Sequence, residues 1–350
     1  MSARGCYTEL QNITRDLRRT TLPSLPPALG FEGDVEYTHQ LGIWKRWIQW
    51  EIDDPLVLKA DETSTYQARV LFAYQQALMA MRYWPELWSE ASDFCFSNGL
   101  DDKGDDFLAQ GINANPESCL LAFKRADRIE LTMKFEDDDE DHTRRAAAVR
   151  QPYDKVLDAL YELITRSDSR KKQELARIEA QFIAEQQTKD LVKDEPEEDQ
   201  AVLQEEASQK EAQKAEQIEA TKRIHDFQVR LLSRTLSYVW IALTRATRRI
   251  QGKGRQEDGG PRGVFVHGSR AVFADARKRG RLSADFYVQT ALLEFHCYDA
   301  ETGRKIFERG LKLHPKDEGY ALEYIKHLVA NNDHISMSII FALPSLDLSG

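Results

Sequence analysis

The chain has 350 residues, of which 41% are hydrophobic and 30% are charged, and its formal net charge is −10. This length allows two or three ordinary domains or one long repeat array. The acidic balance argues against nucleic acid as a partner of the whole surface, but it does not exclude local basic patches that bind nucleic acid.

Membrane insertion, disulfide bonds and bound metals are not expected. No run approaches the roughly 18 apolar residues that a membrane helix needs, and the first ten residues, MSARGCYTEL, lack the apolar core of a secretory signal. The four cysteines contain no CxxC pair, and His296 with Cys297 is an isolated pair. We therefore expect free thiols in a reducing cytosolic or nuclear compartment, with no metal and no cofactor.

The first segment, residues 1–34, is predicted to be a helix followed by a proline-rich linker at PSLPP. Apolar residues then recur at helical spacing, as in residues 66–84, where Val70, Ala73 and Ala77 share one face. Glycine and proline are sparse, and strand-like alternation appears only near the C-terminus. The expected fold class is therefore all-α.

An aromatic residue followed by key residues three and seven positions later recurs along the chain. The first copy is Trp44, Trp47 and Glu51. The other copies are Trp88, Ala91 and Cys95, then Phe123, Ala126 and Glu130, then Trp240, Leu243 and Thr247, then Tyr287, Thr290 and Glu294, and weakly Ala321, Tyr324 and Leu328. Most steps between copies have the length of a two-helix repeat, but the step from Phe123 to Trp240 is much longer.

A second pattern occupies the partner helix of the repeat. One copy is Arg304, Phe307, Gly310 and Pro315. The others are Arg270, Phe273 and Ala276, and Leu108, Gly111, Ile112 and Pro116. A small residue lets a neighbouring helix approach, while a large ring fills the groove between layers. One repeat cannot bury such a face alone, so we expect the repeats to stack into a solenoid.

The tryptophans of IWKRWIQW are expected to have different roles. Trp44 and Trp47 occupy repeat positions and should pack between helix layers. Trp50 lies outside that register, so it is the one expected to face a partner.

These helices resemble the half-a-tetratricopeptide (HAT) repeat of eukaryotic RNA-processing proteins. The stretches WIQWEIDDPL, YQQALMAMRYWPELW and ALLEFHCYDAETGRKIFERGLKLHP are similar, in this order, to the suppressor-of-forked family. That family includes the large HAT subunit of cleavage stimulation factor and its fungal counterpart in pre-mRNA 3′-end processing. The resemblance extends from residue 7 to residue 334, apart from a middle insertion.

The resemblance implies a HAT-repeat (tetratricopeptide-like) helical-hairpin solenoid that is a non-catalytic scaffold of cleavage and polyadenylation. It further implies a homodimer, docking of other cleavage and polyadenylation factor subunits, contact with RNA mainly through those partners, and a nuclear location, with a cytoplasmic one also open. The family's N-terminal repeats are missing, and the last residues, ISMSIIFALPSLDLSG, do not match, which indicates a truncated product or a gene-model error. A HAT scaffold of the spliceosome or pre-ribosome is the alternative.

Four segments are expected after residues 1–34: HAT repeats at 35–166, an insertion at 167–225, HAT repeats at 226–334 and an atypical tail at 335–350. The insertion is rich in Glu, Gln, Lys and Ala. This composition predicts a solvated helix pair broken near KDEPEED, or partial disorder. Its function is either that of a spacer or that of a partner-binding arm.

Charged clusters give weaker signals. Arg245, Arg248 and Arg249 lie at helical spacing and form a candidate patch for direct, weak RNA contact. The alternative for them, and for the basic residues at 277–281, is a charged outer helix face paired with acids. The acidic run EDDDED is expected to be a solvated loop, because the glycine and closing glutamate of an EF-hand are missing. No nucleophile elbow or HExxH motif supports catalysis.

Overall fold

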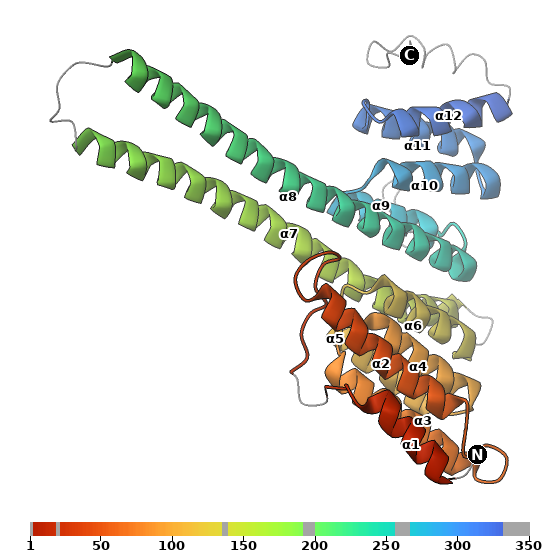
Figure 1. The fold of residues 1–350 in the computed structure, drawn as a ribbon. Coiled ribbons are helices and arrows are strands. Elements are labelled where there is room, and N and C mark those ends of the chain that lie inside the picture. Colours follow the sequence, from red (N-terminus) through yellow and green to blue (C-terminus); the bar gives the residue numbers. More distant parts are fainter. Residues whose placement is uncertain (1–2, 19–21, 135–138, 192–199, 256–266, 332–350) are drawn as a thin grey trace. The chain divides into compact units, whose positions relative to one another are not determined.

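The computed structural model describes residues 3–18, 22–134, 139–191, 200–255 and 267–331 (Figure 1). This part of the chain forms twelve α-helices and no strand, which confirms the all-α prediction. The helices are α1 (Ala3–Thr14), α2 (Asp34–Ile52), α3 (Thr63–Ala80), α4 (Pro85–Ser97), α5 (Asp101–Ala114), α6 (Cys119–Thr132), α7 (Asp139–Leu191), α8 (Gln200–Gln251), α9 (Ser269–Arg279), α10 (Ala284–Cys297), α11 (Ala300–Leu313) and α12 (Glu318–Ala330).

The chain divides into two compact units. The first comprises Met1–Glu136 with Ala147–Val156, and the second comprises Asp137–Ala146 with Leu157–Gly350. The division falls within α7, which runs without interruption from Asp139 to Leu191. The expected boundaries after residues 166 and 225 therefore fall inside α7 and α8 and not at helix ends. The segments 35–166, 167–225 and 226–334 stay predictions.

In the first unit, consecutive helices pack as neighbours from α1 to α6, and α2 with α3 and α4 with α5 form helical hairpins. Trp44 and Trp47 are buried in the core, where their rings stack with centroids 5.5 Å apart. Trp50 is also buried, at 8% exposure. The expectation that Trp50 faces a partner is therefore wrong, because α2 is covered on more than the face that carries the repeat pattern.

In the second unit, α8 packs against α9 and α10, α10 packs against α11, and α12 contacts both α10 and α11. The centre is again aromatic. Its largest fully buried side chains include Trp240, Phe286, Phe307 and Tyr324. Phe307 stacks on Tyr324 with ring centroids 4.7 Å apart, so α11 and α12 are joined through their aromatic faces.

The insertion forms a helix pair over the residues that the structure describes. Beyond the repeat positions, α7 and α8 run side by side (Figure 1). Lys171 Nζ lies 2.6 Å from Asp226 Oδ1, and His225 Nε2 lies 2.9 Å from Glu174 Oε2. Further along, the Lys214 ammonium lies 5.8 Å from the centroid of the Phe182 ring. These contacts give an antiparallel register, and the expected break near KDEPEED lies outside the described residues.

Helix boundaries follow local chemistry. α4 begins with Pro85, whose missing N–H group is not needed in the first turn of a helix. Asp299 caps α11, and its carboxylate accepts hydrogen bonds from the backbone N–H groups of Glu301 and Thr302. α9 ends at Arg279 and is followed by Gly280, whose φ of 76° lies in the left-handed region that glycine adopts without strain.

Two glycines provide a test of the close helix packing. A Cβ atom added to Gly111 would lie 2.9 Å from Cβ of Trp88, whereas a Cβ added to Gly42 would meet nothing within 4 Å. Overpacking costs about 1–3 kcal/mol, and Ala gains about 1 kcal/mol over Gly in a helix interior. Gly111→Ala should therefore lower the free energy of unfolding by about 1 kcal/mol, and Gly42→Ala should raise it by about 0.5–1 kcal/mol. Urea unfolding followed by circular dichroism measures both changes, and equal signs would contradict the packing argument.

Candidate functional site in the helical repeats

The small residue of the second pattern is the contact point between three helices. In α5, a Cβ atom on Gly111 would lie 2.9 Å from Trp88 of α4 and 3.1 Å from Leu121 of α6. In α11, a Cβ atom on Gly310 would lie 2.9 Å from Cβ of Tyr287 in α10 and would overlap the Tyr320 side chain of α12. Thus Trp88 and Tyr287, the aromatic residues of the first pattern, meet the glycines of the second.

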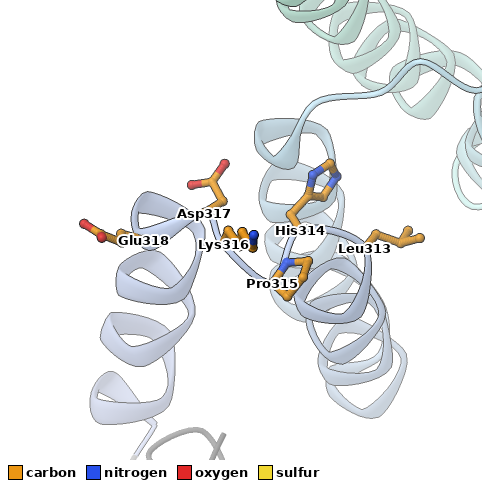
Figure 2. Close-up of a pocket in the computed structure, with 6 residues that line it drawn as sticks. All are labelled: Leu313, His314, Pro315, Lys316, Asp317 and Glu318. Carbon is orange, nitrogen blue, oxygen red and sulfur yellow. The ribbon is translucent and has the colours of Figure 1, made fainter. Parts of the chain in front are cut away.

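The turn after each of these glycines repeats the same geometry. The backbone N–H of Asn115 donates to Gly111 O at 2.8 Å, and that of His314 donates to Gly310 O at 2.9 Å. Each turn then carries the proline predicted to end the helix. Figure 2 shows Pro315 in the second turn and Asp317 at the start of α12, where Asp317 accepts a hydrogen bond from the Tyr320 backbone N–H at 2.9 Å. Ser118 caps α6 in the same way.

A surface hollow lies at this second turn. It is lined by Leu313, His314, Pro315, Lys316, Asp317 and Glu318 (Figure 2). All six residues are consecutive and belong to one helix connection. The His314 ring packs 5.7 Å from the Tyr287 ring, and burial lowers the pKa of this histidine. The hollow is therefore explained as the outer face of a repeat turn.

The motif glutamate of the first hairpin is held by an arginine. Arg69 of α3 donates from Nε to Glu51 Oε2 at 3.0 Å and from Nη2 to Glu51 Oε1 at 3.1 Å. Trp47 Nε1 donates to the same carboxylate at 3.2 Å. Glu51 is buried, and a buried carboxylate is tolerated when charged and neutral donors surround it in this way. The pair thus joins α2 to α3.

The second unit contains an equivalent pair between different helices. Arg270 of α9 donates from Nε to Glu294 Oε1 at 3.0 Å and from Nη2 to Glu294 Oε2 at 2.7 Å. These hydrogen bonds raise the pKa of the Arg270 guanidinium. Here the arginine contacts the next hairpin, because the glutamate position of its own hairpin is occupied by Thr247.

Two arginines of the second pattern were missed in the sequence. Arg69 and Phe72 have the spacing of Arg304 and Phe307, and so do Arg150 and Tyr153. That spacing was the available signal, although neither copy has the small residue three positions further on.

The third hairpin uses the early part of α7. Ala126 of α6 is buried, and the Phe123 ring lies 5.4 Å from the Tyr153 ring, which comes from α7. Glu130, the last residue of this copy, is only partly buried. The first part of α7 therefore serves as the second helix of a repeat.

Most of the remaining repeat residues lie in the helix packing, whereas Arg304 and Pro315 are exposed. Trp240 is fully buried, and its Nε1 donates to Tyr161 Oη at 3.3 Å. Buried residues among the rest include Ala91, Trp88, Tyr287, Phe307 and Gly310. Cys95 is fully buried as well, and burial raises the pKa of its thiol to about 11. A thiol in that state is a core residue and a poor nucleophile.

The basic residues separate into two groups. Arg279 and Arg281 form ion pairs with Asp158 and Asp168 of α7 at 2.7 Å, as the paired outer-face alternative predicts. By contrast, Arg245, Arg248 and Arg249 are exposed on α8. Arg245 donates to Gln289 Oε1 at 2.7 Å, and the Arg248 guanidinium lies 6.0 Å from the centroid of the Tyr298 ring. These three arginines remain a candidate contact surface.

Other kinds of site receive no support from the described ranges. Within them, no group of three or more His, Cys, Asp or Glu side chains could hold a metal ion. None of the helices described has both the length and the apolar character required to cross a membrane.

Comparison with known proteins agrees with this repeat geometry. The family model described as "Suppressor of forked protein (Suf)" matches residues 1–343. The chain belongs to the suppressor-of-forked family. This membership confirms the resemblance, and with the helical structure it confirms the HAT-repeat solenoid class.

Curated relatives of this family member come from fungi. The chain is 53% identical over 343 residues to the "mRNA 3'-end-processing protein rna14" of Emericella nidulans, covering 98% of this chain and 31% of the relative. It is 51% identical to the protein of that name from Aspergillus oryzae, with the same coverage, and 44% identical to "rna-14" of Neurospora crassa, covering 97% of this chain and 29% of the relative. The chain thus spans about a third of the length of these relatives.

The buried ion pair of the second unit gives a stability prediction. Glu294→Gln removes the charge that Arg270 faces, and Arg270 keeps only part of its hydration. The free energy of unfolding should therefore fall by about 2–3 kcal/mol. Glu301→Gln is the matched control, since Glu301 is exposed and pairs with Lys305 on the same helix; its unfolding curve should nearly overlay that of the wild type. Chemical unfolding of both variants measures the difference, and similar curves for the two would show that the buried pair is not needed.

Proposed function

We propose that this chain is a non-catalytic scaffold segment of the nuclear machinery that processes mRNA 3′ ends. In this function it forms a homodimer and docks other cleavage and polyadenylation factor subunits, and RNA is contacted mainly through those partners. The names of relatives with up to 53% identity support a function in mRNA 3′-end processing. One observation supports the scaffold function: the charged repeat residues pair with each other between helices, as Glu51 does with Arg69 and Glu294 with Arg270.

The consequence of this packing is a molecule that works through its outer faces. A repeat array presents an extended surface on which several partners can bind side by side. Catalysis by contrast needs a pocket in which acids, bases or nucleophiles converge. The hollow at Leu313–Glu318 is the surface of a single turn and has no such arrangement.

Direct RNA binding is a second candidate function. It is favoured by one observation, the exposure of Arg245, Arg248 and Arg249 near the end of α8. Contacts of this kind are electrostatic and depend strongly on salt. They give little sequence preference without bases stacked on aromatic side chains.

A competition experiment tests the scaffold function against direct RNA binding. An excess of the purified chain is added to a fungal extract that cleaves a labelled pre-mRNA substrate. The isolated chain should occupy docking sites and lower the cleaved fraction several-fold. The matched variant Arg245→Ala/Arg248→Ala/Arg249→Ala should inhibit equally. Inhibition lost in this variant would favour RNA binding, and no inhibition by the wild type would contradict docking.

The homodimer is tested separately by light scattering coupled to size-exclusion chromatography. The 350-residue chain has a mass of 40.3 kDa. At tens of micromolar, the measured mass should be close to twice this value. A strict monomer over that range would remove the homodimer from the proposal and leave the docking function to the competition experiment.

A further inference from the structure

Helix α8 has a second apolar face that the chain leaves exposed. Ile224, Phe227, Leu231 and Tyr238 are 59%, 55%, 50% and 46% exposed, respectively. Their spacing of three, four and seven residues places all four side chains along one stripe of the helix. We refer to these four residues as the α8 stripe.

The rest of α8 shows that the stripe is not an extension of the core. Leu236, Val239 and Leu243 lie between or beyond the stripe residues in sequence, and all are fully buried. The covered face therefore uses different positions from the exposed one. Single exposed apolar residues are common, but a row at heptad spacing is typical of a helix that packs against another helix. At 1.5 Å per residue, the row from Ile224 to Tyr238 is about 21 Å long.

Arginines accompany the stripe along one edge. Arg223, Arg230 and Arg234 are exposed and lie next to the stripe by helical geometry, and Arg245 and Arg249 continue its line toward the end of α8. Between Arg223 and Arg249 the sequence has one acidic residue, Asp226, which pairs with Lys171. This surface is strongly basic in a chain whose net charge is −10.

The partners of two of these arginines, Arg223 and Arg234, are weak and replaceable. Arg223 pairs with Glu219 on the same exposed helix face at 3.0 Å. Arg234 donates to Tyr238 Oη at 3.2 Å and lies 3.4 Å from Asp285. Exposed ion pairs of this kind contribute little to stability, so an incoming carboxylate can replace them.

We propose that the α8 stripe docks an acidic amphipathic helix from a partner subunit. The partner helix places apolar residues at heptad spacing on the stripe, and its Asp or Glu side chains pair with Arg223, Arg230 and Arg234. This inference rests on the proposed docking function, because it assigns one partner chemistry to one outer face. Both the apolar row and its basic edge are then matched.

Two other occupants fit this surface less well. A second copy of the chain, packed through the same stripe, would set arginines against arginines across a symmetric interface, and like charges in contact oppose association. RNA would meet the arginines, but bases stack on aromatic rings, whereas Ile224 and Leu231 are aliphatic. A protein helix uses both the aliphatic and the aromatic members of the stripe.

The test uses a defined peptide and the full chain. The probe is a fluorescein-labelled peptide of three heptads with Leu at the a and d positions and Glu at the flanking positions. A second peptide has Lys in place of every Glu. In fluorescence anisotropy titrations, the Glu peptide should bind the chain at least 10-fold more tightly than the Lys peptide.

Variants of exposed residues assign the binding to the stripe. Phe227→Ser/Leu231→Ser should weaken binding of the Glu peptide at least 10-fold, and Arg230→Glu/Arg234→Glu should reverse the preference between the peptides. Val329→Ser changes an equally exposed apolar residue on α12 and should leave binding unchanged. Unaltered helical circular dichroism shows that each variant is folded.

Several results would overturn the inference. Equal affinity for both peptides, or full affinity in Phe227→Ser/Leu231→Ser, would show that the stripe does not select an acidic helix. A dimer that dissociates in this variant would assign the stripe to a second copy, and oligouridine binding lost in it would assign the stripe to RNA. If the peptide fails to bind while the chain still inhibits cleavage in extract, this inference falls and the scaffold function stands; loss of inhibition as well would reject both.

Discussion

The distance at which a helix can approach a large aromatic side chain controls this repeat array. At Gly111 and Gly310, a single added carbon atom would lie 2.9 Å from Trp88 and Tyr287, respectively. The ring can fill the groove between layers only because the facing position has no side chain. In these two repeats the helix ends in the same way, with the N–H of Asn115 and that of His314 donating to the carbonyl of the glycine four residues earlier.

The ion pairs add direction to this packing. Glu51 meets Arg69 within one hairpin, while Glu294 meets Arg270 of the preceding hairpin. The same residue types therefore join helices within a repeat in one place and between repeats in another. The reason is that Thr247 replaces the glutamate in the Trp240 copy. Arg270 therefore has no carboxylate at that position of its own hairpin.

These contacts determine where function can be located. The buried motif rings and the pairs Glu51–Arg69 and Glu294–Arg270 are engaged in helix packing, so they stabilise the array. The docking that we propose therefore falls to the outer faces of the helices. Among them, α8 combines an exposed apolar stripe with a basic edge, and this combination separates it from a merely solvated helix face.

The sequence by itself determined the helical class and the aromatic and glycine positions, because residues three, four and seven apart must share a helix face whatever surrounds them. The resemblance of particular stretches to the suppressor-of-forked family indicated the family. The sequence could not show that Trp50 is buried or that Arg270 reaches Glu294, and it left a helix pair and partial disorder as alternatives for the insertion. Those facts depend on which neighbouring helix covers each face. On α8, apolar residues occupy two faces, and periodicity treats them alike. Only the tertiary structure decided that the face with Trp240 is covered and the face with Leu231 is open.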